Sequence, residues 1–389
     1  MTSRRRIAPL YTLKVEKETI KLAQAFTIAR DSRDHVEVVL VTLHDPKTGV
    51  VLGKGEARAY ARYNETPDSV IHDIEQCRQS IEAGKFPDSL HAAAANAVNC
   101  ALIDAQCTKR GRPIADVLAI KCWPAYVITG NTISLDTPDA MATQTRKLLA
   151  NGAHILKIKL GSNEDGQNLA RLRRIVGAVK AHGVPDVKLS VDFNEGCVTM
   201  DGTPDIAHAN DVIYFGATNG IQFLEQPFPE KYDHEDAPAR LRYPVTKLDK
   251  KLPILADESC HTEDSLESVL GICGYRGINM KLAKTGGLKN GVAMVDHLIK
   301  RYPDALLSIG SMASSSLSAA ADYSLVAYAM DRGAKVAFVD VDSPTLVGPE
   351  NDRAHAMRME GSKLFAPPPE LWGGGKAIGY ERKPMASLR

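Results

Sequence analysis

Val191-Asp192-Phe193-Asn194 is the first of three short apolar stretches that end in a carboxylate; Leu224-Glu225-Gln226-Pro227 and Ala256-Asp257-Glu258-Ser259 are the other two. Two lysines, Lys159 and Lys281, close stretches of the same kind on either side. The five charged residues follow one another at intervals of roughly 24 to 33 residues, about the length of one strand, one helix and two loops in a (β/α)8 barrel. A single charged residue after a strand is usually just exposed to solvent. Five charged residues at the ends of five consecutive strands predict that their side chains converge at one mouth of a barrel.

Short β-branched runs alternate with amphipathic stretches from about residue 128 to residue 345, which is typical of a parallel sheet covered by helices. Eight such runs favour a closed barrel over an open doubly wound sheet, and no Gly-x-Gly-x-x-Gly motif follows the first run. We therefore expect an α/β fold of the (β/α)8 type. The predicted strands are residues 127–134, 154–160, 187–193, 221–225, 253–256, 277–282, 305–309 and 336–341.

The rest of the chain predicts an α+β capping domain. Residues 36–43 alternate as a strand does, and a turn at 45–49 leads into a returning run at 50–53. An Ala- and Leu-rich segment, 92–106, indicates a buried helix. We expect the cap at residues 1–127, the barrel at 128–345, and a Pro- and Gly-rich C-terminal segment at 346–389 that packs back on the cap.

Composition excludes several classes of protein. The 48 Lys and Arg residues and 47 Asp and Glu residues give a formal net charge of +1. The net charge therefore does not attract the protein to nucleic acid or to an anionic membrane. No uninterrupted apolar run approaches the roughly 20 residues of a membrane span. Seven cysteines without a CxxC pair are typical of reduced thiols, and charged residues follow Arg4-Arg5-Arg6 where a signal peptide requires an apolar run. We expect a cytoplasmic protein with a small-molecule substrate and no nucleic-acid or membrane partner; a homo-oligomer stays open.

The predicted mouth suits metal-assisted proton transfer. Asp192, Glu225 and Asp257 offer only hard oxygen ligands, which suits one Mg²⁺ ion and leaves positions open for substrate oxygens. A lysine acts as a base when its pKa falls, and both Mg²⁺ and Lys157, on the same strand face as Lys159, push the pKa of Lys159 that way. For an isolated lysine and carboxylate, a purely structural ion pair is the simpler interpretation. The phasing favours removal of a proton next to a metal-bound carboxylate, which produces an enediolate that the metal stabilises.

Five motifs resemble the muconate-lactonizing subgroup of the enolase superfamily, over nearly the whole chain. In this subgroup the lysines that correspond to Lys159 and Lys281 flank the substrate on opposite faces. The resemblance therefore implies a proton removed on one face and returned on the other, as in racemisation or epimerisation. The motifs are Lys157-Ile158-Lys159, Asp192-x-Asn194, Glu225-Gln226-Pro227, Ala256-Asp257-Glu258-Ser259 and Asn279-Met280-Lys281-Leu282-Ala283-Lys284-Thr285-Gly286-Gly287.

Two further segments resemble the dipeptide epimerases of that subgroup. Asp340 and Asp342 lie on one face of the last predicted strand, where a paired DxD holds the substrate ammonium group in those enzymes. Residues 26–33 resemble the specificity loop of the L-Ala-D/L-Glu type, in which an arginine receives the glutamate side chain; Arg33 is the first candidate and Arg30 the second. The implied activity is Mg²⁺-dependent dipeptide epimerisation by 1,1-proton transfer in murein peptide metabolism. Thr132, Lys157 and Ser311 complete the predicted substrate-binding set.

Two departures and several alternatives remain. Many relatives carry glutamate in place of Ser314 and aspartate in place of Ala283. Neither position is a predicted metal ligand or base, so we expect these departures to affect substrate specificity more than the reaction itself. A cycloisomerase or o-succinylbenzoate synthase, or an N-acylamino acid racemase, uses the same metal and lysines on a substrate without an ammonium group. An acid-sugar dehydratase normally uses a histidine that residues 306–318 lack. An inactive binding protein is expected to have lost a metal ligand or a base, and this chain keeps them all.

Overall fold

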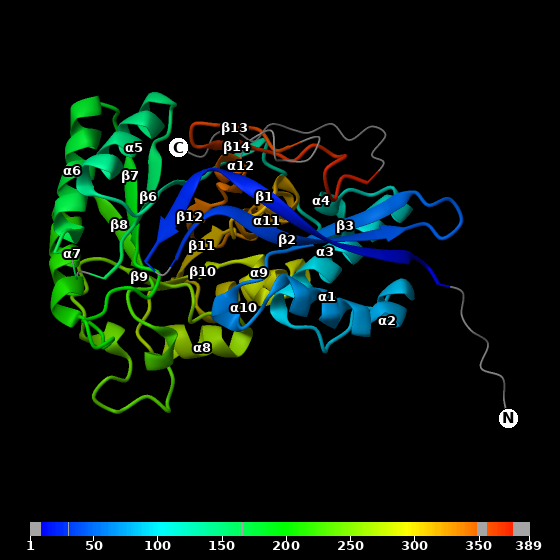
Figure 1. Ribbon diagram of the computed structural model, residues 1–389, viewed down its shortest axis with the longest axis horizontal. Helices are drawn as coiled ribbons and strands as arrows, with labels where there is room; N and C mark the ends of the chain where they lie inside the picture. Colours follow the sequence, from blue (N-terminus) through cyan, green and yellow to red (C-terminus); the bar gives the residue numbers. More distant parts are fainter. Residues whose placement is uncertain (1–8, 30, 163, 165, 348–355, 376–389) are drawn as a thin grey trace.

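Eight parallel strands form a sheet nearly closed into a barrel, at the left of the view in Figure 1. The computed structural model describes residues 9–29, 31–162, 164, 166–347 and 356–375. The eight strands follow chain order around the sheet, and each neighbouring pair is parallel, which confirms the predicted fold class. They are β5 (Asn131–Ile133), β6 (Ile155–Lys159), β7 (Lys188–Asp192), β8 (Ile221–Glu225), β9 (Ile254–Ala256), β10 (Gly277–Met280), β11 (Leu306–Gly310) and β12 (Val336–Asp340).

The residues before β5 bring the first and last strands together. The Gly130 amide donates a hydrogen bond of 2.7 Å to the Val339 carbonyl on β12, and the Thr129 hydroxyl donates to the same oxygen at 3.2 Å. A Cβ at Gly130 would lie 2.6 Å from the Phe338 ring. Glycine is therefore required where the two edges meet, because a side chain there would collide with the aromatic ring.

The first predicted strand, residues 127–134, was too long. Its beginning forms β4 (Tyr126–Ile128), which pairs with β14 (Lys363–Phe365) of the C-terminal segment, and only residues 131–133 join the barrel as β5. β13 (Met359–Glu360) completes this small antiparallel sheet. A continuous β-branched run does not reveal that its two halves pair with different partners, so the sequence pattern merged them.

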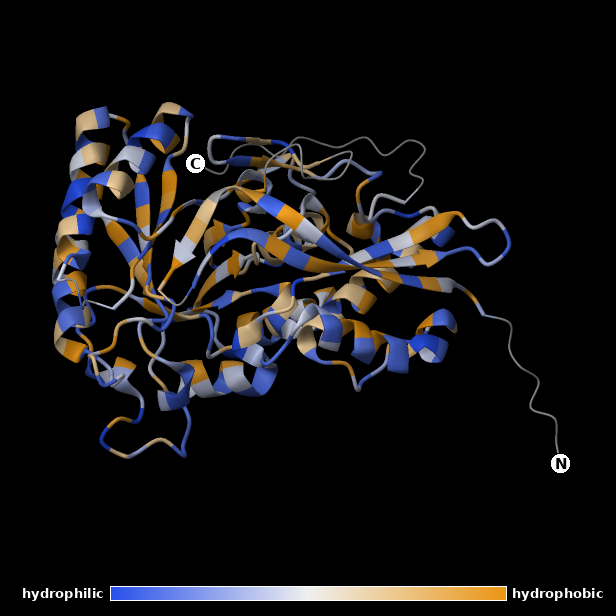
Figure 2. Cartoon of the chain, viewed as in Figure 1, coloured by the Kyte–Doolittle hydropathy of each residue, from blue (hydrophilic) through white to orange (hydrophobic). Residues whose placement is uncertain are grey.

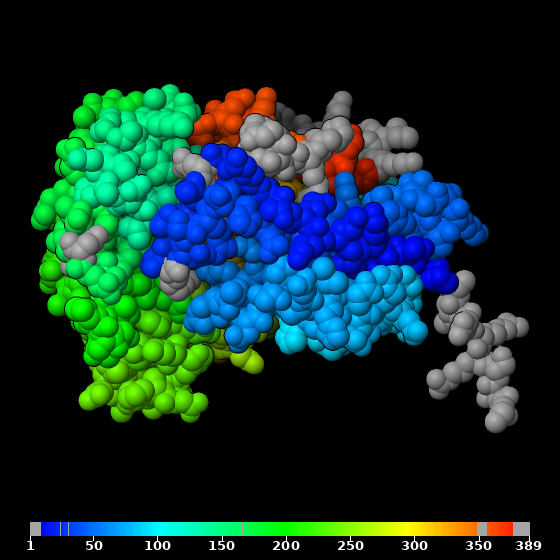
Figure 3. Space-filling model, in the orientation of Figure 1, coloured from blue at the N-terminus to red at the C-terminus, as the bar shows by residue number. Residues whose placement is uncertain are grey.

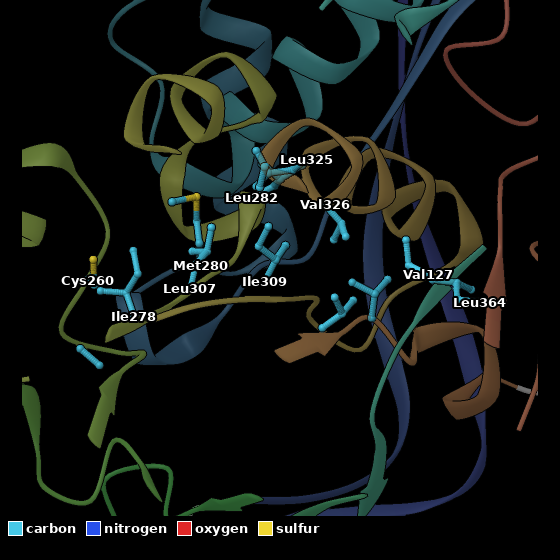
Figure 4. Close-up of a cluster of buried hydrophobic side chains, with 14 of the residues drawn as sticks. Val127, Cys260, Ile278, Met280, Leu282, Leu307, Ile309, Leu325, Val326 and Leu364 are labelled. Carbon is cyan, nitrogen blue, oxygen red and sulfur yellow. The ribbon is translucent and has the colours of Figure 1, made fainter. Parts of the chain in front are cut away.

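Helices cover the outside of the barrel. Ile278, Met280, Leu307 and Ile309, from β10 and β11, pack with Leu325 and Val326 of the last long helix in one buried cluster (Figure 4). Figure 2 shows apolar strands inside and mixed helices outside, as expected when a sheet is buried on both faces. The helices are α5 (Pro138–Ala150), α6 (Asn168–His182), α7 (Ile206–Thr218), α8 (Glu263–Gly271), α9 (Leu282–Thr285), α10 (Leu288–Arg301), α11 (Ser316–Asp331) and α12 (Ser343–Leu346).

The N-terminal residues form the α+β cap. Its antiparallel sheet has the order β1-β2-β3, and the predicted hairpin is the β2–β3 pair. β1 was not predicted from the sequence, because its regularly spaced charges hide a strand that buries Leu13, Ile20 and Leu22. The elements are β1 (Thr12–Ile28), β2 (Asp31–His44), β3 (Val51–Ala57), α1 (Pro67–Gln76), α2 (Arg78–Glu82), α3 (Ala92–Arg110) and α4 (Ile114–Val117).

The C-terminal segment contacts the cap. The Trp372 indole donates to the carbonyls of Lys54 and Cys100, at 3.0 and 3.3 Å, and the Gly373 amide donates to Asp104 at 2.8 Å. In Figure 3 the N-terminal residues, in blue, lie against barrel residues, in green. We propose that the chain divides at residues 127 and 345 as its sequence predicts. Within the described ranges no helix has the length and apolarity needed to cross a membrane.

The close contact between β3 and α3 predicts that a larger residue at Gly55 lowers the stability of the protein. A Cβ at Gly55 would lie 2.0 Å from the Ala97 carbonyl oxygen, so Gly55→Ala should force the two elements apart and lower the free energy of unfolding by about 1–3 kcal/mol. Urea unfolding followed by circular dichroism measures the change. Gly177→Ala on α6, where a new Cβ meets nothing within 4 Å, is the matched control and should raise the free energy of unfolding by up to about 1 kcal/mol. Equal effects of the two substitutions would contradict the close packing.

Candidate active site

Five consecutive strands bring the predicted charges to one mouth of the barrel. Lys159, Asp192 and Glu225 are the last residues of β6, β7 and β8, and their Cα atoms are direct neighbours in the ladder. Asp257 follows β9, and Lys281 follows β10. The strand order therefore places one lysine at each end of a row of three carboxylates. The predicted convergence of these five side chains is present in the structure.

The three carboxylates form a compact set of oxygen donors. Asp192, Glu225 and Asp257 are at most 1% exposed, and each offers an oxygen within 4.8 Å of those of the other two. Three buried carboxylates repel one another strongly unless positive charge lies between or beside them. A purely oxygen donor set of this size fits a Mg²⁺ ion, which takes one or a few carboxylates and keeps other positions for water or substrate.

Lysines neutralise the carboxylates from both sides. Lys159 Nζ lies 2.7 Å from Asp192 Oδ2, and Lys281 Nζ lies 2.7 Å from Asp257 Oδ2. A third lysine, Lys284, is buried and contacts the other oxygen of Asp257. Burial is the largest influence on the pKa of Lys281 and lowers it, but the charges of Asp257, Glu225 and Glu258 together outweigh burial and raise the pKa above its usual range. The carboxylates around Lys281 thus favour its ammonium form.

Lys157 lies beneath the carboxylates instead of in the pocket. It has no exposed surface, and its Nζ is 2.9 Å from Glu225 Oε1, 2.7 Å from Asp340 Oδ2 and 3.1 Å from Asp192 Oδ2. Burial lowers the pKa of Lys157, but Asp340, Glu225 and Asp192 together hold it well above its usual value. Its charge therefore helps to assemble the acidic groups, and it does not line the pocket described next.

A pocket of about 670 Å³ opens beside the two flanking lysines. Barrel and cap residues line it together, so both domains complete the site. Seven predicted site residues are among its lining: Arg33, Thr132, Lys159, Lys281, Ser311, Asp340 and Asp342. Phe26, Ile28, Asp31, Arg58, Tyr60, Asn194, Met312, Ala313 and Leu346 complete it.

The paired aspartates offer an anionic corner of this pocket. Asp340 Oδ1 is buried and accepts no hydrogen bond from the described residues, while Asp340 Oδ2 accepts from Lys157. Asp342 Oδ2 accepts from the Thr132 amide at 2.9 Å. Burial, followed by the charge of Asp340, raises the pKa of Asp342 to about 6. This corner is complementary to a cation, because a positive group would relieve the repulsion between the two carboxylates.

The cap end of the pocket carries arginine. Arg33, near the start of β2, forms an ion pair with Asp31, and burial lowers the pKa of Arg33. Arg30, the second candidate from the sequence, lies outside the described residues. Arg58, which directly follows β3, lines the same pocket and was not selected from the sequence.

Side chains near the metal ligands hold them in place, and sequence reasoning missed their roles. Asn279 Nδ2 donates to Glu225 Oε1 at 2.7 Å, and its place two residues before Lys281 on one strand face was an available signal. Gln226 Oε1 accepts from the Asp257 amide at 2.8 Å. A Cβ at Gly310 would lie 2.9 Å from Asn279 Oδ1 and 3.1 Å from Lys281 Cε, so this glycine leaves room for both side chains.

An ion pair fastens the cap to the mouth of the barrel. Arg62 in the cap donates to both oxygens of Glu195, in the loop after β7, at 2.8 and 2.7 Å, and to Glu230 at 3.0 Å. Parallel bonds of this kind fix orientation as well as distance. Nothing in the local sequence pairs residues 62 and 195, so the contact could not be foreseen.

The two departures from the family pattern lie together. Ser314 and Ala283 line a separate hollow of about 400 Å³ between the cap and the barrel, with Glu56 and Asp322. The Ser314 hydroxyl donates to the Met312 carbonyl at 2.9 Å. Neither residue lines the pocket beside the lysines, although Arg58 and Met312 border both spaces.

Several known proteins are similar to this chain in sequence. Residues 140–361 match the family model described as "Enolase C-terminal domain-like". An L-Ala-D/L-Glu epimerase of Escherichia coli (strain K12) is 33% identical over 86% of this chain and 94% of its own length. An N-acetyl-D-glutamate racemase of a Pseudoalteromonas species is 30% identical over 83% of this chain and 91% of its own length.

A solved structure is similar over nearly the whole chain. It is an enolase family member from Agrobacterium tumefaciens with homology to dipeptide epimerases, and it contains sodium and L-Ala-L-Glu with an ordered loop. It is 31% identical, covers 93% of this chain and 99% of its own, and has a TM-score of 0.77. The family match and the relatives' identity over most of their length show that this chain belongs to the enolase superfamily.

Proposed function

We propose that this protein is a Mg²⁺-dependent dipeptide epimerase that interconverts L-Ala-L-Glu and L-Ala-D-Glu. The observation that carries the proposal is the row of three buried carboxylates with Lys159 at one end and Lys281 at the other. The similarity to an L-Ala-D/L-Glu epimerase and to a structure that contains L-Ala-L-Glu supports this substrate class. We further propose that the enzyme is cytoplasmic and serves the recycling of peptidoglycan peptides.

Asp192, Glu225 and Asp257 are the proposed Mg²⁺ ligands. If these residues hold Mg²⁺, the ion would supply positive charge, which would offset the charge that develops on the substrate carboxylate and would lower the pKa of the nearby lysines. Lys157 and Asn279 position Glu225 through bonds of 2.9 and 2.7 Å. The burial of these groups excludes water, so their electrostatic effects are larger than they would be in solution.

Lys159 and Lys281 are the proposed bases on the two faces of the substrate. The neutral lysine removes the α-proton of the second residue, and the ammonium group of the other lysine donates a proton to the opposite face. The configuration at the α-carbon is inverted, and the two lysines exchange their roles for the reverse reaction. Both line the pocket, so both can reach a bound dipeptide.

Three charged regions match the three charged groups of Ala-Glu. Asp340 and Asp342 would receive the terminal ammonium group and Arg33 the side-chain carboxylate, since all three line the pocket. A Mg²⁺ ion held by Asp192, Glu225 and Asp257 would supply positive charge for the α-carboxylate. Thr132 holds Asp342, and Ser311, which contacts Ser343 at 2.7 Å, borders the same pocket.

An N-acylamino acid racemase is the second candidate, because a relative of similar identity is an N-acetyl-D-glutamate racemase. An acylated amine has no positive charge. It would leave Asp340 Oδ1 buried and without a partner among the described residues. This carboxylate favours a free ammonium group, and the cycloisomerase alternative is disfavoured for the same reason.

The metal proposal predicts the effect of one substitution. Glu225→Gln should weaken Mg²⁺ binding by more than the roughly 10- to 100-fold that loss of an outer-shell partner costs, because it removes a ligand charge. Calorimetric titration with Mg²⁺ measures the affinity directly, and the exposed Glu235→Gln is the control. Unchanged affinity in Glu225→Gln would remove this residue from the ligand set.

The two-base proposal predicts equal dependence on both lysines. Lys159→Ala and Lys281→Ala should each reduce epimerisation of L-Ala-L-Glu by roughly 10²- to 10⁴-fold, the usual contribution of a general acid or base. Polarimetry follows the reaction, and Lys180→Ala, an exposed lysine on α6, should retain normal activity. Normal epimerisation by the Lys281→Ala enzyme would show that another group serves the second face.

The ammonium assignment predicts a loss common to all dipeptides. Asp342→Asn should lower kcat/KM for L-Ala-L-Glu and L-Ala-L-Gln alike by roughly 10- to 150-fold, since both substrates share the charged contact. N-acetyl-L-glutamate should be a poor substrate for the unaltered enzyme. Efficient racemisation of N-acetyl-L-glutamate together with no turnover of L-Ala-L-Glu would instead establish the racemase alternative.

A further inference from the structure

The cap end of the active-site pocket carries more positive charge than its own acids balance. Two guanidinium groups, Arg33 and Arg58, line this end together with Asp31; the other two acids in the pocket lining, Asp340 and Asp342, belong to the barrel. Asp31 is the ion-pair partner of Arg33. Arg58 has no carboxylate within ion-pair distance among the residues that the structure describes.

Backbone carbonyls hold Arg58 at the pocket wall. Its Nη1 donates to the Ala59 carbonyl at 2.6 Å and to the Glu37 carbonyl at 3.3 Å. Both contacts use one nitrogen, and the described residues offer no hydrogen-bond acceptor to Nε or Nη2. The guanidinium is thus fixed in position with donors to spare, which is the arrangement that binds an anion with little loss of side-chain entropy.

The two arginines act on each other. Burial lowers the pKa of Arg58 to about 10, and the charge of Arg33 is the next largest cause of that decrease. Arg33 lies near the start of β2, and Arg58 follows the end of β3, its neighbour in the cap sheet. A carboxylate placed between the two side chains would remove their repulsion and gain bonds from both.

We propose that Arg58 is a second specificity residue, which together with Arg33 receives the side-chain carboxylate of an acidic second residue. This inference rests on the proposed dipeptide epimerase function and adds a residue to its substrate site. The paired clamp makes the enzyme selective for dipeptides that end in Glu or Asp over neutral dipeptides of the same shape. An anion is therefore held at the cap end and an ammonium group at Asp340 and Asp342.

The test compares two substrates that differ only in charge. L-Ala-L-Glu and L-Ala-L-Gln have nearly the same shape, so the ratio of their kcat/KM values isolates recognition of the carboxylate. Arg58→Met should lower the Glu/Gln ratio by roughly 10- to 150-fold, mainly through a higher KM for the Glu substrate. Arg58→Lys, which keeps the charge and loses the fork of donors, should retain part of the preference.

Controls separate recognition from folding and from the proposed function itself. Arg146→Met, an exposed arginine on α5, should leave the ratio unchanged, and thermal unfolding checks that each variant is folded. An equal loss for both substrates in Arg58→Met would overturn the proposal, because it would show that Arg58 only supports the backbone of Glu37 and Ala59. A full loss of preference in Arg33→Met with none in Arg58→Met would overturn it too. No turnover of any dipeptide by the unaltered enzyme would mean that the proposed function itself had failed.

Discussion

The site depends on the burial of several carboxylates in one small space. Asp192, Glu225 and Asp257 are nearly inaccessible, and Asp340 lies close enough to share Lys157 with Glu225. Such a group of like charges is unstable in a protein interior without compensating cations. The lysines around this group supply the compensating positive charge. Some of these lysines also line the pocket, where they could transfer protons to and from a substrate. Structural compensation and chemistry thus draw on the same side chains.

The compensation has two levels. Lys157 is enclosed beneath the carboxylates, while Lys159 and Lys281 lie at the ends of the row and border the pocket. A lysine that is fully enclosed can only balance charge. A lysine at the end of the row can also reach a substrate. Two such lysines at opposite ends suit a reaction in which a proton is removed from one face of a carbon and returned to the other. Access to the pocket therefore separates the proposed structural lysine, Lys157, from the proposed bases.

The cap restricts what the barrel chemistry acts on. Its glycines allow β3 to lie against α3, and Arg62 joins it to Glu195 at the barrel mouth. These contacts fix the end of the pocket that contains Arg33 and Arg58 relative to Asp340 and Asp342. The separation of the cationic end from the anionic corner favours a substrate that carries opposite charges at its two ends.

Sequence alone predicted the barrel, because strand-end charges recur with the period of a βα unit. The metal and base candidates followed from that phasing, and the structure brings them together. The full burial of Lys157 was not predictable, since the alternation of residues along a strand shows on which face a side chain lies and not how deeply it is buried. Contacts across long sequence separations, such as Arg62 with Glu195, leave no local pattern. The change of partner between β4 and β5 was hidden in one apolar run.

Deuterium incorporation tests the central claim most directly. L-Ala-L-Glu is incubated with the Mg²⁺-saturated enzyme in D₂O, and early samples are separated and analysed by mass spectrometry and ¹H NMR. Two lysines on opposite faces predict that the first L-Ala-D-Glu formed carries deuterium at the α-carbon, because the donating lysine has exchanged with solvent. The remaining L-Ala-L-Glu should gain deuterium more slowly. Early product that keeps its α-hydrogen, or a substrate that neither exchanges nor epimerises, would contradict the account.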